Sequence, residues 1–105
     1  MYKIEVYFDK QGRSPFNDWL MRLNSNVRAR VAARIARFEM GNLGDKKRVG
    51  DGVFEARIHF GPGLRIYFGI SNKNLIILLI GGDKKSQFRD ISLAKRLWAD
   101  WKEND

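Results

Sequence analysis

The stretch that decides the fold is VFEARIHFGPGLRIYFG, residues 53–69. Apolar side chains occupy every second position on both sides of Gly61-Pro62-Gly63. Alternation with a period of two around such a turn predicts two antiparallel strands. We expect the apolar set to pack on helices and the other set to face out of the opposite side of the sheet. That second set comprises Val53, Glu55, Arg57, His59, Arg65 and Tyr67.

The segments on either side of this hairpin predict different structures. Downstream, Leu75–Ile80 is apolar without any alternation, which is typical of a central strand covered on both faces. Upstream, GNLGDKKRVGDG at 41–52 has four glycines and the basic run Lys46-Lys47-Arg48. This composition predicts a mobile loop that can approach a polyanion.

The remaining segments complete an α+β pattern. Alternation from Tyr2 to Phe8 predicts a strand, and Ser14-Pro15 is a typical start for a short helix. A second helix is expected from Val27 to about Met40, and a last helix is expected to be capped by Ser86. The predicted order is strand, helix, helix, three strands, helix. We expect one domain, 1–105, with an antiparallel sheet packed against the helices.

Composition restricts the possible functions. The chain of 105 residues carries a formal charge of +8, which favours nucleic acid or a nucleoprotein as partner over solubility alone. Without cysteine and with one histidine, a zinc site is not expected. The sequence has no cluster of carboxylates of the kind that a two-metal nuclease needs. The phosphate-binding glycine motifs are also absent. We therefore expect no metal and no cofactor. Without a long apolar segment we also expect no membrane contact, and a cytoplasmic protein.

Two arginines of the hairpin are the central candidates for binding an anion. Arg57 and Arg65 are expected on neighbouring strands and on one face, so both guanidinium groups can converge on a phosphate. Lys84 and Lys85 follow the central strand, and Arg89 lies one turn into the last helix, so we expect them to reach the same cleft. The alternative is a solvated face on which the two arginines pair with Glu55, with the lysines in solvated loops.

Other residues could take part in chemistry or in binding RNA. His59 is the only histidine, and histidine ordinarily titrates near neutrality, so it could transfer a proton or simply lie on the surface. Tyr67 could stack on a base or pack within the sheet. The basic run Lys46-Lys47-Arg48 could contact RNA or remain a solvated loop.

The element order, the 53–69 hairpin and the ending LLIGGDKKSQFRDISLAKRLWADWK at 78–102 together resemble a known family. They are similar to the RelE/HigB toxins of bacterial toxin–antitoxin modules, specifically the phage-related addiction module killer protein branch of the RelE/ParE superfamily. The resemblance implies a RelE-like fold and a ribosome-dependent mRNA interferase. Such an endoribonuclease needs no metal, because the 2′-hydroxyl of one nucleotide attacks the adjacent phosphodiester.

The resemblance also implies partners and residue roles. The partners would be a cognate antitoxin, typically a small helix-turn-helix protein, the mRNA and the ribosome with its rRNA. Operator DNA would be contacted only through the antitoxin complex. Arg65 matches the family arginine at the scissile phosphate, Arg57 a preceding basic strand position, and Lys84 a basic residue after the last strand.

The sequence also departs from the family pattern. Some members have a tyrosine in the first turn of the last helix, where this chain has Phe88-Arg89-Asp90, and others have a lysine where Glu55 stands. Glu55 and His59 are both candidates to deprotonate the 2′-hydroxyl. Two alternatives remain on the same fold: a ParE-like gyrase inhibitor, and a catalytically inactive basic module that binds nucleic acid or a partner.

Overall fold

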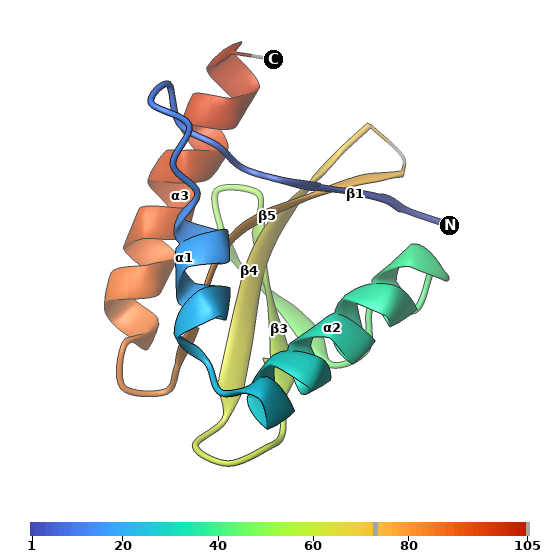
Figure 1. The fold of residues 1–105 in the computed structure, drawn as a ribbon. Coiled ribbons are helices and arrows are strands. Elements are labelled where there is room, and N and C mark those ends of the chain that lie inside the picture. Colours follow the sequence, from blue (N-terminus) through green and yellow to red (C-terminus); the bar gives the residue numbers. More distant parts are fainter. Residues whose placement is uncertain (73, 105) are drawn as a thin grey trace.

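A computed structural model describes residues 1–72 and 74–104 of the chain. Its elements, in chain order, are β1 (Lys3–Val6), α1 (Pro15–Arg22), α2 (Ser25–Glu39), β2 (Lys46–Gly50), β3 (Val53–Ile58), β4 (Leu64–Ser71), β5 (Leu75–Asp83) and α3 (Gln87–Asn104). The strands form one five-stranded sheet in the order β1-β5-β4-β3-β2 (Figure 1). This arrangement confirms the predicted α+β class and is consistent with a RelE-like fold.

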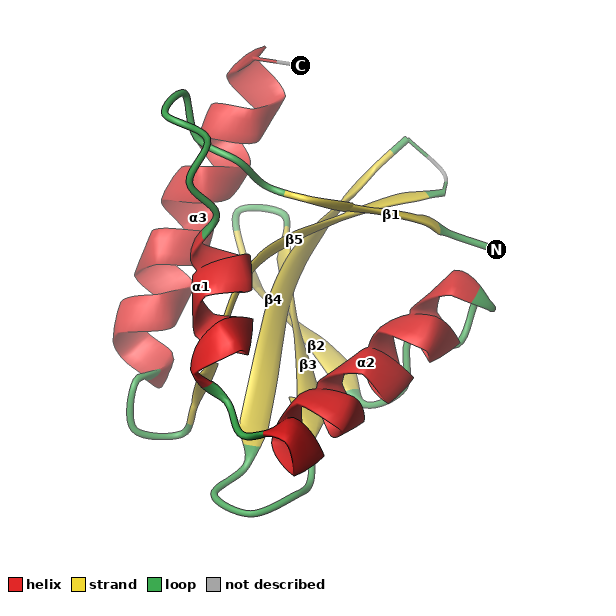
Figure 2. Cartoon of the chain, viewed as in Figure 1, coloured by secondary structure: helices red, strands yellow, loops and turns green. Residues whose placement is uncertain are grey.

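Helices lie against both faces of the sheet (Figure 2). One core lies between the sheet and the pair α1 and α2, and includes Phe16, Trp19, Val31, Phe38, Ile66 and Phe68. The other core lies under α3, and includes Val53, Tyr67, Ile77, Ala94 and Trp98. The unalternating apolar run of β5 is thereby explained, because its side chains enter both cores.

Capping side chains start the first two helices, and α2 begins at Ser25, two residues before the expected Val27. The Ser14 hydroxyl accepts a hydrogen bond from the Asn17 backbone N–H at 3.2 Å, and Pro15 is the first residue of α1. The Asn24 side chain caps α2 in the same way, accepting from the Val27 N–H at 3.0 Å. Both caps satisfy amide donors that a helix leaves unpaired in its first turn.

The predicted hairpin is confirmed in its register. β3 and β4 pair antiparallel with Arg57 directly opposite Arg65 and Glu55 opposite Tyr67. Directly opposed residues point to the same face of a sheet. The hairpin therefore places these four side chains on one face.

The prediction of a mobile loop at 41–52 is wrong in its second half. Residues 46–50 form the edge strand β2, which pairs antiparallel with β3. Asp51 and Gly52 connect the two strands with φ of 55° and 82°. Two central residues with positive φ suit the twist of a tight hairpin, and Asp-Gly is a preferred pair there. The glycine-rich composition concealed this strand.

Two further details differ from the predicted sheet. β1 pairs with β5 in parallel, so the sheet is mixed rather than antiparallel. In addition, α3 covers the face that was expected to be open, and Glu55 and Tyr67 are fully buried beneath it. Within the described residues, no helix combines the length and apolar character needed to cross a membrane.

Candidate functional site

A buried carboxylate organises the polar side chains under α3. Glu55 is 0% exposed. Its Oε2 accepts hydrogen bonds from the Tyr67 hydroxyl at 3.0 Å and from Gln87 Nε2 at 2.9 Å. Its Oε1 accepts from Arg57 Nε at 3.2 Å. Both oxygens are therefore occupied by donors from β3, β4 and α3.

Three cations surround this carboxylate, and we name Glu55, Lys47, Arg57 and Arg65 together the Glu55 cluster. Lys47 Nζ lies 3.8 Å from Oε1, and Arg65 Nε lies 3.6 Å from Oε2. Each cation comes from a different strand, since Lys47 pairs with Glu55 across β2 and β3 while Arg57 opposes Arg65. One carboxylate shared by three cations leaves the cluster with net positive charge.

The hydrogen bonds keep Glu55 ionised. Burial by itself would raise the pKa of Glu55, but the donors Gln87, Tyr67 and Arg57, together with Lys47, outweigh it and hold the pKa below its ordinary value. Burial and the neighbouring Glu55 carboxylate raise the pKa of Tyr67, so its hydroxyl remains a donor. Glu55 thus acts as a fixed anion that holds the cations in place.

Arg65 is the most buried of the three cations of the Glu55 cluster. Its side chain is 9% exposed, and Nη1 donates to the Gly63 carbonyl at 3.3 Å. Its buried Nε makes no hydrogen bond with any described residue. A buried N–H without an acceptor is costly. This Nε faces Glu55 Oε2 at 3.6 Å.

His59 lies outside the Glu55 cluster but is tied to Arg57 through Asp45. Its side chain is 72% exposed, and Nε2 lies 2.7 Å from Asp45 Oδ2. The backbone carbonyl of Asp45 accepts from the Arg57 N–H at 3.0 Å. The hydrogen bond from His59 is the main cause that lowers the pKa of Asp45. Asp45 therefore holds His59 beside the strand that carries Arg57.

The lysines after β5 lie close to the hairpin turn. Lys84 and Lys85 are exposed and line, with Pro62 and Asp83, an open hollow of about 570 Å³. Register places this hollow near Arg65, because Arg65 pairs with Gly82. Arg89 is 82% exposed and does not contact the Glu55 cluster.

The basic run of β2 is divided between the two faces of the sheet. Lys47 joins the Glu55 cluster, whereas Lys46 Nζ and the Arg48 guanidinium lie 5.4 and 5.5 Å from the Phe54 ring on the other face. The prediction of a loop is therefore wrong for these three residues, which alternate between the two faces of a strand. Their contact with RNA stays a prediction.

The expectation that Tyr67 stacks on a base also needs correction. Its side chain is 0% exposed, so the ring has no face available to a base. Its hydroxyl instead holds Glu55. The alternative interpretation of the sequence, packing within the sheet, describes its position.

Sequence reasoning missed Gln87 altogether. This residue begins α3 and supplies the shortest hydrogen bond to Glu55. Nothing in the local sequence indicates that α3 crosses the sheet at Glu55. The role of Lys47 could have been found from the Asp51-Gly52 turn, which fixes the partner strand.

The described residues include no group of three His, Cys, Asp or Glu side chains that could hold a metal ion. The titratable groups described above beside the cations are Glu55, Tyr67 and the Asp45–His59 pair. The chemistry available to these residues alone is electrostatic stabilisation of an anion, with one exposed imidazole beside it.

Residues 18–99 match the family described as "Phage derived protein Gp49-like (DUF891)". The chain belongs to the Gp49-like family. This is a toxin-like family of addiction modules, and membership implies an antitoxin partner. The chain is also similar to a protein of Haemophilus influenzae described as an uncharacterized protein. The two are 49% identical over 83 residues, which cover 78% of this chain and 84% of the relative. The matched region of this Gp49-like protein contains every residue of the Glu55 cluster.

Proposed function

We propose that this Gp49-like protein is the toxin of a toxin–antitoxin module and cleaves mRNA on the ribosome without a metal ion. The observation that carries the proposal is the convergence of Lys47, Arg57 and Arg65 on one buried carboxylate. A phosphodiester carries one negative charge, and the net positive cluster can bind it without moving Glu55.

In the proposed reaction, Arg65 and Arg57 bind the scissile phosphate. Guanidinium groups donate paired hydrogen bonds to phosphate oxygens and remain protonated. The 2′-hydroxyl attacks the phosphorus and the bond to the 5′-oxygen breaks. The leaving 5′-oxygen takes a proton from water, so a cyclic phosphate and a 5′-hydroxyl are formed. Charge on the phosphorane-like transition state is stabilised by fixed donors, each worth about 3 kcal/mol in comparable sites. Lys84 lies beyond β5 and extends the positive surface along the RNA.

His59 is the proposed proton acceptor for the 2′-hydroxyl. Glu55 is poorly suited to this role, because its oxygens are occupied and its pKa is lowered. If His59 Nε2 carries the proton donated to Asp45, Nδ1 is the nitrogen left to accept one. We assign Glu55 the role of a positioning residue.

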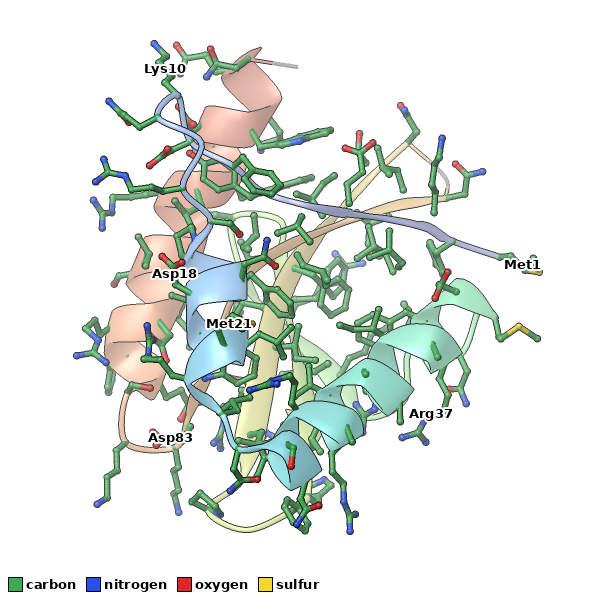
Figure 3. All side chains as sticks on the ribbon, in the orientation of Figure 1. Met1, Lys10, Asp18, Met21, Arg37 and Asp83 are labelled. Atoms are coloured by element: carbon green, nitrogen blue, oxygen red, sulfur yellow. The ribbon has the colours of Figure 1, made fainter. Side chains whose placement is uncertain are left out.

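The test is primer extension on a defined message in a reconstituted translation system, with and without ribosomes. Wild-type protein is expected to give cuts in phase with the codons only when ribosomes are present. Arg65→Ala is expected to remove the cuts while the circular dichroism spectrum is unchanged. Arg37→Ala is the matched control, because this exposed arginine lies on the outer side of α2 (Figure 3).

Two outcomes would contradict the proposal. A folded Arg65→Ala protein that cuts as well as wild type would remove the assignment of the site. Intact messages together with broken DNA in treated cells would instead support a gyrase inhibitor of the ParE type.

A further inference from the structure

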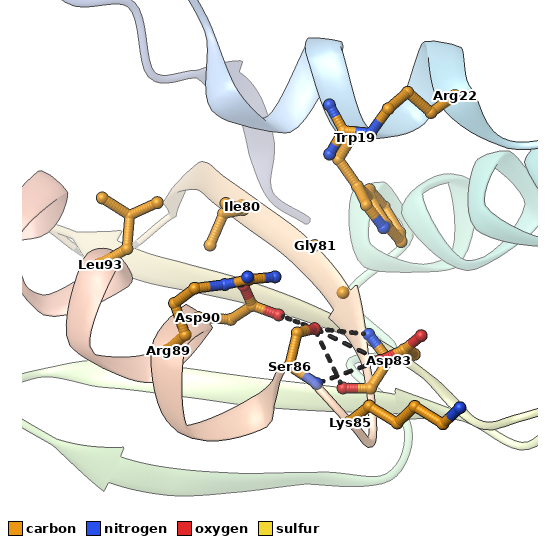
Figure 4. Close-up of a pocket in the computed structure, with 11 residues that line it drawn as sticks. Trp19, Arg22, Ile80, Gly81, Asp83, Lys85, Ser86, Arg89, Asp90 and Leu93 are labelled. Carbon is orange, nitrogen blue, oxygen red and sulfur yellow. Dashed lines mark hydrogen bonds and ion pairs between the residues drawn. The ribbon is translucent and has the colours of Figure 1, made fainter.

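A second site lies at the free edge of β5, between α1 and α3. β1 pairs with β5 only from Leu75 to Leu78, so the end of β5 has no strand neighbour on that side among the described residues. A cavity of about 600 Å³ occupies this position. Figure 4 shows the Trp19 ring reaching it from α1, with Ser86 and Asp90 of the opposite wall near the end of β5.

The inner wall of the cavity holds a carboxylate whose ion-pair partner among the described residues is an exposed arginine. Asp90 is 4% exposed, and its Oδ2 accepts from the Ser86 hydroxyl at 2.5 Å. Its Oδ1 accepts no hydrogen bond from any described residue and forms an ion pair with the exposed Arg89, whose Nε lies 3.9 Å away. Burial raises the pKa of Asp90. A buried carboxylate with unused acceptor capacity favours a ligand that brings N–H donors.

The backbone is shaped to admit this carboxylate. A Cβ atom at position 82 would lie 1.8 Å from Asp90 Oδ2, so only glycine leaves room for it. Gly82 also pairs with Arg65 of β4. The Asp90 wall of the cavity therefore lies under α3, on the face of the sheet that carries the Glu55 cluster, whereas the Trp19 wall lies on the other face.

The mouth of the cavity has the opposite charge. Arg22 of α1, Lys85 of the β5–α3 turn and Arg89 of α3 all line it. Three cations there favour a ligand that is anionic at its outer end. These three cations also disfavour the insertion of a lysine or arginine side chain from a partner protein. Asp90 at the inner wall disfavours a ligand that is anionic along its whole length.

A guanine nucleotide has both of these features. The Watson–Crick edge of guanine presents the adjacent donors N1–H and N2–H, which match the two oxygens of a carboxylate, whereas adenine, cytosine and uracil each present a single donor group on that edge. We propose that this cavity binds a guanine nucleotide, with the base against Asp90 and the phosphate at Arg22, Lys85 and Arg89.

The role of such a site in reading mRNA rests on the proposed function. Because the cavity adjoins Arg65, a base held there belongs to a nucleotide near the scissile phosphate. The cavity would then select guanine at one position of the message. The binding itself does not depend on cleavage, so the two proposals can be tested separately.

The test is a titration of wild-type protein with 5′-GMP, 5′-IMP, 5′-AMP and inorganic phosphate. Binding is followed by calorimetry and by the NMR shift of the Trp19 indole N–H, assigned with Trp19→Phe. Inosine lacks the 2-amino group, so 5′-IMP loses one hydrogen bond to a charged group. It is therefore expected to bind at least about tenfold more weakly than 5′-GMP. Asp90→Asn is expected to abolish the difference between 5′-GMP and 5′-IMP.

Matched controls separate this effect from general changes in charge. Asp51→Asn removes an exposed carboxylate in the β2–β3 turn and is expected to leave the preference for 5′-GMP intact. Equal affinities for the three nucleotides, or inorganic phosphate binding as tightly as 5′-GMP, would overturn the proposal. This comparison uses wild-type protein and so decides the question even if Asp90→Asn fails to fold.

Failure of one proposal is distinguishable from failure of the other. Arg65→Ala is expected to retain the preference for 5′-GMP while losing cleavage. A protein that selects 5′-GMP but cuts no message would refute only the proposed function. A protein that cuts messages but shows no preference among the nucleotides would refute only the guanine site.

Discussion

Replacing Glu55 by glutamine tests whether this carboxylate holds the cation cluster together. Glutamine can keep an oxygen acceptor for Tyr67 and Gln87, but its NH2 group then faces Arg57 Nε, which in the wild type lies 3.2 Å from Oε1. One charge-assisted hydrogen bond is lost, and three cations remain without their shared anion. We expect a loss of about 3 kcal/mol in the free energy of unfolding, within the range for breaking buried pairs. In a domain of this size, that loss lowers Tm by roughly 12 to 20 °C.

Thermal and urea denaturation followed by circular dichroism measure this loss, and its pH dependence identifies the cause. The pKa of Glu55 in the folded protein lies below its ordinary value. Its contribution is therefore fully present above the ordinary carboxyl pKa and is lost as the pH falls through the folded value. The stabilities of wild type and Glu55→Gln should converge at acid pH.

Glu5→Gln is the matched control, because Glu5 is an exposed strand residue of β1. It should melt like wild type. Equal Tm values for wild type and Glu55→Gln at pH 7 would refute the assignment of Glu55 as the organising anion. A deficit that stays constant down to acid pH would refute its electrostatic origin.

Four other substitutions give further tests. Arg65→Lys keeps the charge but loses the planar fork, and should reduce message cleavage at least about tenfold; an unchanged rate would show that charge alone suffices. His59→Gln should lower cleavage about a hundredfold, and an unchanged rate would exclude His59 as proton acceptor. Gly69→Ala places a Cβ 2.4 Å from the Trp98 ring, which should cost about 1 to 3 kcal/mol in urea denaturation; an unmoved midpoint would contradict this packing. Burial raises the pKa of Asp90, so ionisation of this carboxyl opposes folding above the ordinary carboxyl pKa. Asp90→Asn should therefore raise Tm at pH 7 but not at acid pH. A Tm below that of wild type at pH 7 would contradict the raised pKa.

The parts of the fold that local patterns determine could be predicted from the sequence. Alternation fixed the β3–β4 hairpin and therefore the pairing of Arg57 with Arg65. Capping side chains located the start of α1, and that of α2 to within two residues. These features depend on residues close in the chain, where steric rules leave few choices.

Features that depend on distant segments were not predictable in the same way. The path of α3 over Glu55 results from packing between Trp98 and the sheet, and no local pattern encodes it. The strand β2 was concealed by the glycines around it, although Asp51-Gly52 is a hairpin signal. Burial of Tyr67 follows from the path of α3. The placement of Lys47 beside Glu55 follows from the strand β2.

The parallel pairing of β1 has a consequence for the behaviour of the protein during expression. β1 covers the edge of Leu75–Leu78, which begins the most apolar segment of the chain. An uncovered apolar strand edge is a template for pairing between molecules. Removal of the first six residues would therefore expose a surface prone to self-assembly while leaving every residue of the Glu55 cluster in the chain. Insoluble protein from such a truncation would reflect a lost edge cover rather than a defect in the cation cluster.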